Sequence, residues 1–210
     1  MIASRRLLLV AGAATLAGCA SEGESAAGLT PAEIEGPFYP VSPPAESDAD
    51  LTRLAGRSQR ALGQIIEVGG RVLDRRGQPI LGARVELWQC NAAGRYDHPG
   101  DRTTVALDPN FQSYADLRTG PDGRFRVTSV MPAAYWVPEM GQRRTPHIHF
   151  KVAGGDGPLT TQMYFPGEPM NETDFIIKEM KADPRTLIAR EAPAMETGAR
   201  GFDWDIVLDA

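Results

Sequence analysis

The sequence predicts an all-β fold in which two sheets form a sandwich, with short helices and long loops. Glycine and proline are plentiful, at 22 and 17 of the 210 residues, which favours many short elements joined by turns. Segments such as 83–88 and 124–127 alternate apolar and polar residues, which is the pattern of half-buried strands. Turn signals such as Asp122-Gly123 separate these segments at the spacing typical of sandwiches.

The expected elements follow in order along the chain. A helix should begin at Thr30, because Thr30 at the N-cap, Pro31 at the first position and Glu33 at the third form a capping motif. A second short helix is expected over 174–180, and Pro184 ends it. Strands are expected at 65–73 (with a Gly-Gly bend), 83–88, 124–127, 146–152, 160–165 and 202–208.

The stretch 70–96 makes the expected sandwich more specific. It contains Gly-x-Val, a turn, and then Gly-Ala-x-Val-Glu-Leu, and in this it resembles the opening of prealbumin-like domains. The resemblance implies a prealbumin-like β-sandwich. Because many binding modules share this architecture, it says little about function.

Size and charge restrict the class of protein. A chain of 210 residues suits one domain, which we place at 30–210 behind a removable front end. The formal net charge is −5 and no basic stripe is visible, so nucleic acid is not expected as a partner. Only two cysteines are present, and Cys90 lies in an apolar run where a buried, inert thiol is expected.

Residues 1–19 are expected to be a signal peptide. Arg5 and Arg6 precede an apolar stretch, 7–17, that is too short to span a bilayer. The end of this segment, Leu-Ala-Gly-Cys19, resembles a bacterial lipobox, which implies cleavage before Cys19 and a lipid anchor on it. Residues 20–29 are small and polar, as in a flexible tether. The protein is therefore expected on the periplasmic side of the cell envelope, held to a membrane through Cys19.

The route of export stays open. The segment around Arg5-Arg6 also resembles a twin-arginine signal, although Leu8 and Val10 depart from that pattern. Twin-arginine export carries folded proteins, which would suit a protein that loads a specific metal before export. A general secretory signal, and an incidental cysteine at position 19, are the alternatives.

The histidines predict a metal site. The chain has three, and two of them form His147-Ile148-His149 in an expected strand. Alternate residues of a strand project from one face, so the two imidazoles should lie side by side with Ile148 on the other face. This spacing suits two ligands of one metal ion, but it also occurs in exposed strands without a metal. His98 is interpreted as a surface or pocket-rim residue.

The surrounding segments resemble intradiol ring-cleavage dioxygenases of the protocatechuate and catechol type. The stretch 87–96, which ends at Tyr96, is similar to the segment of the first tyrosine ligand in that family. The stretch 144–150 is similar to its Arg-Pro-x-His-Ile-His-Phe segment, and Tyr135 lies where the second tyrosine ligand is expected. The likeness extends over about 30–172. Thr145-Pro146 and a loop from Tyr135 to His147 that is about one residue shorter depart from the family pattern.

The resemblance implies an Fe(III) site with Tyr96, Tyr135, His147 and His149 as ligands. Phenolate is a hard donor that suits a hard cation, and imidazole also suits iron. The expected substrates are a catechol-type aromatic and O2, with cleavage between the two hydroxyl-bearing carbons to a muconate-type diacid. Tyr135 is implied to leave the metal when the catechol binds. Arg144 is implied to stabilise negative charge on the substrate, and Gln162 to make a polar contact near the ligands.

Two other hypotheses remain open from the sequence. An Fe(II) oxygenase with two histidines and a carboxylate, Glu139 or Glu168, would cleave outside the diol but leaves both tyrosines unexplained. A prealbumin-like binding module on the envelope would need no activity. The ring substituent of the substrate also stays open, as does the oligomeric state, for which the family offers a homodimer or a pairing of two related chains. Three further tyrosines are expected to pack or to line the pocket, namely Tyr39, Tyr114 and Tyr164.

Overall fold

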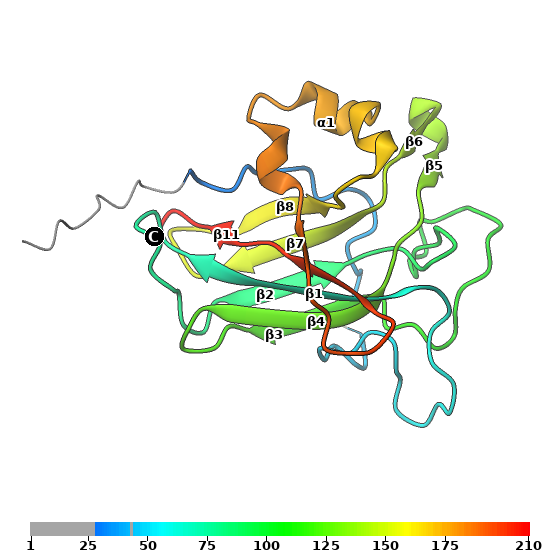
Figure 1. Ribbon diagram of the computed structural model, residues 1–210. Coiled ribbons are helices and arrows are strands. Elements are labelled where there is room, and N and C mark those ends of the chain that lie inside the picture. Colours follow the sequence, from blue (N-terminus) through cyan, green and yellow to red (C-terminus); the bar gives the residue numbers. More distant parts are fainter. Residues whose placement is uncertain (1–27, 43) are drawn as a thin grey trace, which may run out of the picture.

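The computed structural model describes residues 28–42 and 44–210, with the Glu139 side chain left out. The expected signal peptide and residues 20–27 of the expected tether lie outside this part of the chain. The described residues form a β-sandwich flanked by short helices (Figure 1). The predicted all-β fold is confirmed. Within the described residues, no helix has the length and apolarity needed to cross a bilayer.

Two sheets make the sandwich. In the first, β1 (Ile65–Leu73) pairs antiparallel with β4 (Arg124–Val130) and parallel with both β10 (Arg200–Asp203) and β11 (Ile206–Val207), and β9 (Arg190–Ala192) extends the edge beyond β10. The second has the order β3 (Tyr114–Arg118), β2 (Arg84–Trp88), β7 (His147–Ala153), β8 (Leu159–Tyr164). The sheets meet in one core, where Phe125 of β4 lies 5.9 Å from Phe150 of β7 between ring centroids.

Short elements gather beside the second sheet. A hairpin of β5 (Tyr135–Val137) and β6 (Gln142–Arg144) encloses the 3-10 helix η1 (Pro138–Met140). After β8 come η2 (Pro169–Glu172), α1 (Phe175–Glu179) and η3 (Pro184–Leu187). In Figure 1 the hairpin and α1 both stand above β7 and β8. These short elements cover part of the outer face of this sheet.

Strand alternation separates the core from this outer face. On β7, Ile148 and Phe150 belong to the core cluster between the sheets. Their neighbours His147 and His149 point the other way, as period-two geometry requires. Trp88 is paired with His149 across β2 and β7, and it belongs to a second buried cluster with Tyr96, Tyr114 and Tyr135. The register therefore gathers the predicted ligands outside the core.

Two expectations about elements were wrong. No helix begins at Thr30, because the Thr30 N–H donates to the Val207 carbonyl and the Thr30 hydroxyl accepts from the Val207 N–H. Pairing with the tail thus outweighs the local capping motif. The expected strand 202–208 is split into β10 and β11, and between them the Trp204 carbonyl crosses directly over Gly70, where a Cβ atom would collide with it. Strands β3, β5, β6 and β9 were not predicted.

Candidate metal centre

The two histidines of β7 converge. Their Nε2 atoms lie 3.1 Å apart, and both side chains are buried. Two nitrogen ligands on one metal ion, at bonds of about 2.1 Å, would have a separation of about 3 Å. The Nδ1 of His147 lies 2.6 Å from the Thr145 carbonyl, which can only accept, so Nδ1 carries the hydrogen and Nε2 presents its lone pair. The ring of His149 is stacked on Trp88, with centroids 4.9 Å apart.

The two tyrosines complete a ring of four donors. The Tyr135 ring lies 5.6 Å from His147, the Tyr96 ring lies 6.3 Å from His149, and the two phenols are 5.3 Å apart, all between centroids. The Tyr96 hydroxyl is buried and has no hydrogen-bond partner among the described residues. Because a buried hydroxyl without a partner is costly, this atom requires an explanation. A metal ion bound between the four rings would provide one.

Burial sets the protonation state of this cluster. It lowers the pKa of His147 well below its usual range and that of His149 to about 3, and Arg144 adds to both effects. Both imidazoles are therefore neutral and able to bind a metal. Burial raises the pKa of Tyr135 to about 12, against the opposing effect of Arg144, and that of Tyr96 well above its usual range. Only a nearby cation can hold these phenols ionised at neutral pH, and a hard cation suits phenolate oxygen.

Arg144, on β6, is held in place beside the cluster. Its Nε donates to Asp174 at 2.8 Å, and its Nη2 donates to the Gln162 side-chain oxygen at 2.7 Å. Asp174 also accepts from the Thr145 N–H and caps α1 by accepting from the Ile176 N–H. Gln162 is paired with His149 across β7 and β8, and its amide nitrogen donates to the Ile34 carbonyl. The guanidinium thus has one fixed direction.

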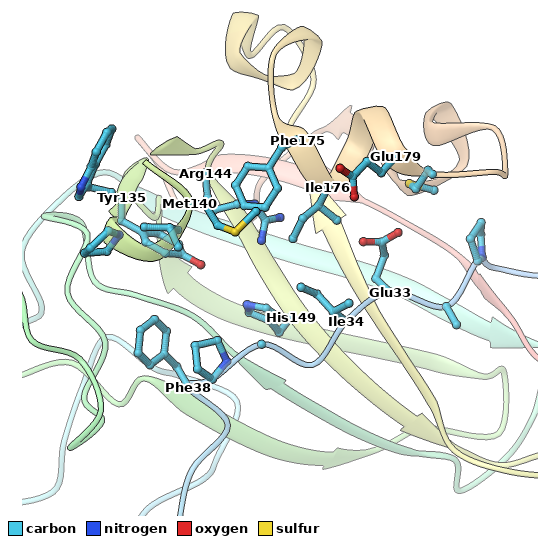
Figure 2. A pocket seen from close by; sticks show the side chains of 18 of the residues that line it. Glu33, Ile34, Phe38, Tyr135, Met140, Arg144, His149, Phe175, Ile176 and Glu179 are labelled. Atoms are coloured by element: carbon cyan, nitrogen blue, oxygen red, sulfur yellow. The ribbon is translucent and has the colours of Figure 1, made fainter. Parts of the chain in front are cut away.

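A cavity of about 1170 Å³ opens beside the ring of donors. Figure 2 shows Tyr135, Arg144 and His149 around it, with Phe38 and Ile34 from the N-terminal segment and Phe175 and Ile176 from α1. Tyr96 and His147 do not line it. Gly36 has φ +70° and a Cβ there would lie 3.3 Å from the His149 ring, so this glycine lets the chain pass closely over a predicted ligand. The cavity is closed on one side by residues 31–38 and on the other by α1.

Comparison with known proteins identifies the family. A family model described as "Dioxygenase" matches residues 34–210. Protocatechuate 3,4-dioxygenase beta chain from Burkholderia cepacia is 40% identical over 178 residues, which cover 82% of this chain and 76% of that protein. Catechol 1,2-dioxygenase 2 from Acinetobacter lwoffii is 35% identical over 170 residues, covering 73% and 58%. The chain belongs to the intradiol ring-cleavage dioxygenase family.

Solved structures of intradiol dioxygenases share the fold. The dioxygenase domain of a carbohydrate-binding fusion protein from Streptomyces sp. SirexAA-E superposes with a TM-score of 0.65 at 31% identity, covering 87% of this chain and 99% of that one. Catechol 1,2-dioxygenase from Pseudomonas arvilla C-1 gives 0.64 at 26% identity, covering 86% and 62%. This chain spans less than two thirds of several catechol dioxygenases, including 63% of the one from Pseudomonas sp. strain EST1001. The family also makes the chain an enzyme of the intradiol ring-cleavage class.

The carboxylate ligands of the Fe(II) alternative find no support in the described residues. Among these, no three His, Cys, Asp or Glu side chains are grouped as a metal site. Glu168 caps η2 by accepting from the Met170 N–H, and it does not line the cavity. The Glu139 side chain lies outside what the structure describes.

Two residues of this dioxygenase site were missed from the sequence, namely Asp174, which orients Arg144, and Glu33, which lines the cavity. Phe38, which stacks on Tyr96 with centroids 4.6 Å apart, belongs to the segment 35–39, which resembles the family's approach to the site. Asp174 was visible only as the start of a helix, and nothing local linked it to Arg144, thirty positions away. His98, interpreted as a surface or pocket-rim residue, lies edge-on to Phe38. Of the tyrosines expected to pack or to line the pocket, Tyr39 and Tyr114 both donate to Glu86, and Tyr164 contacts Gln162. Cys90 is buried and free.

Proposed function

We propose that this chain is an Fe(III)-dependent intradiol dioxygenase that acts on a catechol-type substrate. Both atoms of O2 enter the product, the bond between the two hydroxyl-bearing carbons breaks, and a muconate-type diacid forms. The ring supplies the electrons, so no further reductant is needed. The observation that carries the proposal is the convergence of two buried phenols and two neutral imidazoles, with the Tyr96 hydroxyl lacking a hydrogen-bond partner among the described residues.

The residues that would hold the iron are Tyr96, Tyr135, His147 and His149. Two phenolates and two imidazoles form a donor set that suits Fe(III). The chemistry that a bound ferric ion would supply is activation of the catecholate ring toward O2. Everything else in the reaction falls to the side chains of this chain.

Tyr135 is suited to take up a substrate proton. Unlike Tyr96, it lines the cavity, so an incoming catechol meets its oxygen first. Burial raises the pKa of Tyr135 to about 12, so its phenolate, once released from a cation, is a strong base. The Tyr135 Oη is therefore the expected acceptor of a catechol hydroxyl proton. Tyr96, behind it, is the expected permanent ligand.

Arg144 would stabilise negative charge on the substrate. Asp174 and Gln162 fix its guanidinium, which is 3% exposed, at the edge of the cavity. A preorganised cation in a largely buried site stabilises developing charge more strongly than the same group in water. The apolar walls, such as Phe38 and Phe175, would keep water from the ring.

Purified protein supplied with iron tests the proposal. We expect a visible ligand-to-metal charge-transfer band, O2 uptake with catechol, and a muconate-type product. Tyr96→Phe should lose the band and lower kcat/KM by at least about a hundredfold, as expected for loss of an activated centre. His98→Gln, a nearby residue outside the donor ring, serves as the control. An extradiol product, or full activity in Tyr96→Phe, would contradict the assignment.

We also propose that the protein is exported and lipid-anchored at Cys19 on the periplasmic side of the envelope. The charged start, the short apolar stretch and the Leu-Ala-Gly-Cys19 motif support this. Cys19→Ser should release the protein from the membrane fraction and abolish labelling by a fatty-acid probe. Replacing Arg5 and Arg6 by lysine separates the routes, because only twin-arginine export should be blocked.

A further inference from the structure

The cavity is much larger than a catechol needs. Pockets for drug-sized ligands span about 300–1,000 Å³, and this cavity of about 1170 Å³ exceeds that range. One end is bounded by Tyr135, His149 and Arg144. The rest extends between the N-terminal segment and α1, where Ile34, Ile176 and Met180 make its walls apolar. A single aromatic ring bound at the metal would leave most of this volume unfilled.

Glu33 breaks the apolar lining. Its backbone N–H donates to the Thr160 carbonyl at 2.9 Å, which docks the N-terminal segment along β8. Figure 2 shows its carboxylate projecting into the cavity, opposite Ile176 and Glu179. The Oε2 atom is buried and has no hydrogen-bond partner among the described residues. The side chain as a whole is half-buried, so the carboxylate lies at the border of the space that a catechol ring would leave open, with Oε2 covered by protein.

The surroundings do not satisfy this carboxyl group. Burial raises the pKa of Glu33, Arg144 acts in the opposite direction, and Asp174 raises it again. Arg144 directs its hydrogen bonds to Asp174, Gln162 and Tyr164, and none of its bonds goes to Glu33. A buried acceptor without a donor costs free energy, and a ligand donor that the carboxylate turned to meet would recover it.

We propose that Glu33 is a specificity-determining residue that accepts a hydrogen bond from a chain on the catechol ring. This rests on the proposed dioxygenase function. The substrate class is a catechol with a ring substituent that crosses the apolar part of the cavity and ends in a hydroxyl or ammonium group. A substituent ending in a carboxylate is disfavoured at Glu33, because two groups of like charge would face each other there, and Lys181, which also lines the cavity, is exposed to solvent.

The test compares matched substrates on the iron-loaded full chain at mildly alkaline pH. Three catechols carry a hydroxyethyl, an aminoethyl or a carboxymethyl chain para to one hydroxyl, and unsubstituted catechol is the reference. O2 uptake gives kcat/KM, and anaerobic titration calorimetry gives Kd without turnover. Each value is divided by that of unsubstituted catechol with the same protein. We expect the aminoethyl and hydroxyethyl compounds to exceed the carboxymethyl compound by about tenfold in both ratios.

Variants assign this preference to one residue. Glu33→Gln keeps the shape and removes the charge, so it should lose most of the aminoethyl preference. Glu179→Gln is the matched control, because its carboxylate also lines the cavity but is exposed and screened by solvent, and a smaller change is expected. An equal change in the two variants would overturn the assignment to Glu33.

The outcomes separate the two proposals. Should wild-type protein cleave catechol but show no preference against the carboxymethyl compound, the inference about Glu33 is wrong and the dioxygenase proposal stands. This comparison needs only the wild-type protein, so it decides the question even where Glu33→Gln fails to fold. If iron-loaded protein cleaves no catechol at all, the dioxygenase proposal fails and the Glu33 inference fails with it.

Discussion

The Trp88 side chain shows how a residue outside the donor ring can control it. Its indole lies against the His149 ring at an angle of 7°, and Tyr39 packs edge-on against the indole with ring centroids 5.0 Å apart. Tyr39 is itself held by a hydrogen bond to Glu86 at 2.6 Å. Because His149 Nδ1 has no hydrogen-bond partner among the described residues, stacking is what fixes this ring.

Trp88→Leu should therefore weaken iron binding. Loss of an outer residue that orients a metal ligand typically costs about 10–100-fold in affinity. Trp88→Phe keeps an aromatic face and should retain most of the iron. Iron content after dialysis against a chelator, together with the intensity of the visible band, measures the effect independently of turnover. Wild-type iron retention in Trp88→Leu would show that stacking does not position His149.

Local spacing predicted the two histidines as candidate ligands, and the family resemblance added Tyr96 and Tyr135. The His-x-His pair follows from strand periodicity, and in the structure these two rings face the same side. The partners of the site could not be predicted in this way. Glu33 illustrates the reason, because its local context indicated a helix cap, whereas the structure places it in a cavity wall through pairing with Thr160, 127 positions later.

At the scale of elements, α1 has a second role as the support of Arg144. Its N-cap, Asp174, is fully buried and accepts from Arg144 through one oxygen and from the helix through the other. Asp183, the N-cap of η3, also accepts from its helix and from an arginine, but this pair is exposed and the arginine, Arg185, belongs to η3 itself. The two caps therefore differ in burial and in whether the arginine comes from a distant part of the chain.

Asp174→Asn should destabilise the protein strongly. The amide can still cap the helix through its oxygen, but its NH2 group would face the Arg144 donor. Removing one of the two charged partners of a buried ion pair costs about 3–5 kcal/mol of stability. Denaturant unfolding should show this loss, and kcat should fall because the guanidinium loses its orientation. Asp183→Asn, the exposed counterpart, should leave both unfolding and kcat at wild-type values; comparable losses in the two variants would rule out burial as the cause.

The segment 28–38 is an element that local sequence did not reveal. Thr30 joins it to β11, since its hydroxyl accepts from the Val207 N–H at 2.8 Å. Thr30→Val should leave that buried N–H without a partner and lower the free energy of unfolding by about 1–2 kcal/mol. The looser cavity wall should also raise KM for catechol. Thr30→Ser keeps the hydroxyl and should behave as wild type, and hydrogen exchange of the Val207 amide reports directly on the contact.

Across the whole molecule, the positions of the strands could be predicted better than which strands pair with each other. Alternating residues indicated β2 and β4, and β1 was expected as a strand with a Gly-Gly bend. In the structure β4 starts with alternately buried residues, whereas β1 and β2 are buried on both faces. No local signal shows that β1 pairs in parallel with β10 and β11, which lie more than a hundred residues later. Very short strands such as β9, with three residues, are too short to show a period. Such a strand forms because a neighbouring strand offers backbone groups to pair with, as β10 does for β9.

The long-range hydrogen bonds of Glu67 make the stability of the fold depend on pH in a way that can be tested. This carboxylate on β1 is 3% exposed and accepts from the Met195 and Glu196 N–H groups and from Arg126 of β4. Burial by itself raises the pKa of Glu67, but these three donors outweigh it and hold the pKa below 4.5. The folded protein therefore binds this proton less readily than the unfolded chain does.

A carboxyl group with a lowered folded pKa stabilises the fold above its unfolded pKa, and the contribution is lost as pH falls through the folded value. Glu67→Gln should therefore be less stable than wild type at neutral pH, by about 1–2 kcal/mol for the weakened hydrogen bonds. The difference should begin to shrink as the pH drops below about 4.5, where the unfolded chain takes up the proton, and should continue to shrink as the pH falls through the lower folded pKa, where wild type is protonated. Denaturant unfolding over a series of pH values measures it. Glu191→Gln, in an exposed pair with Arg200, is the control; a constant gap between Glu67→Gln and wild type at every pH would exclude Glu67 as the titrating group.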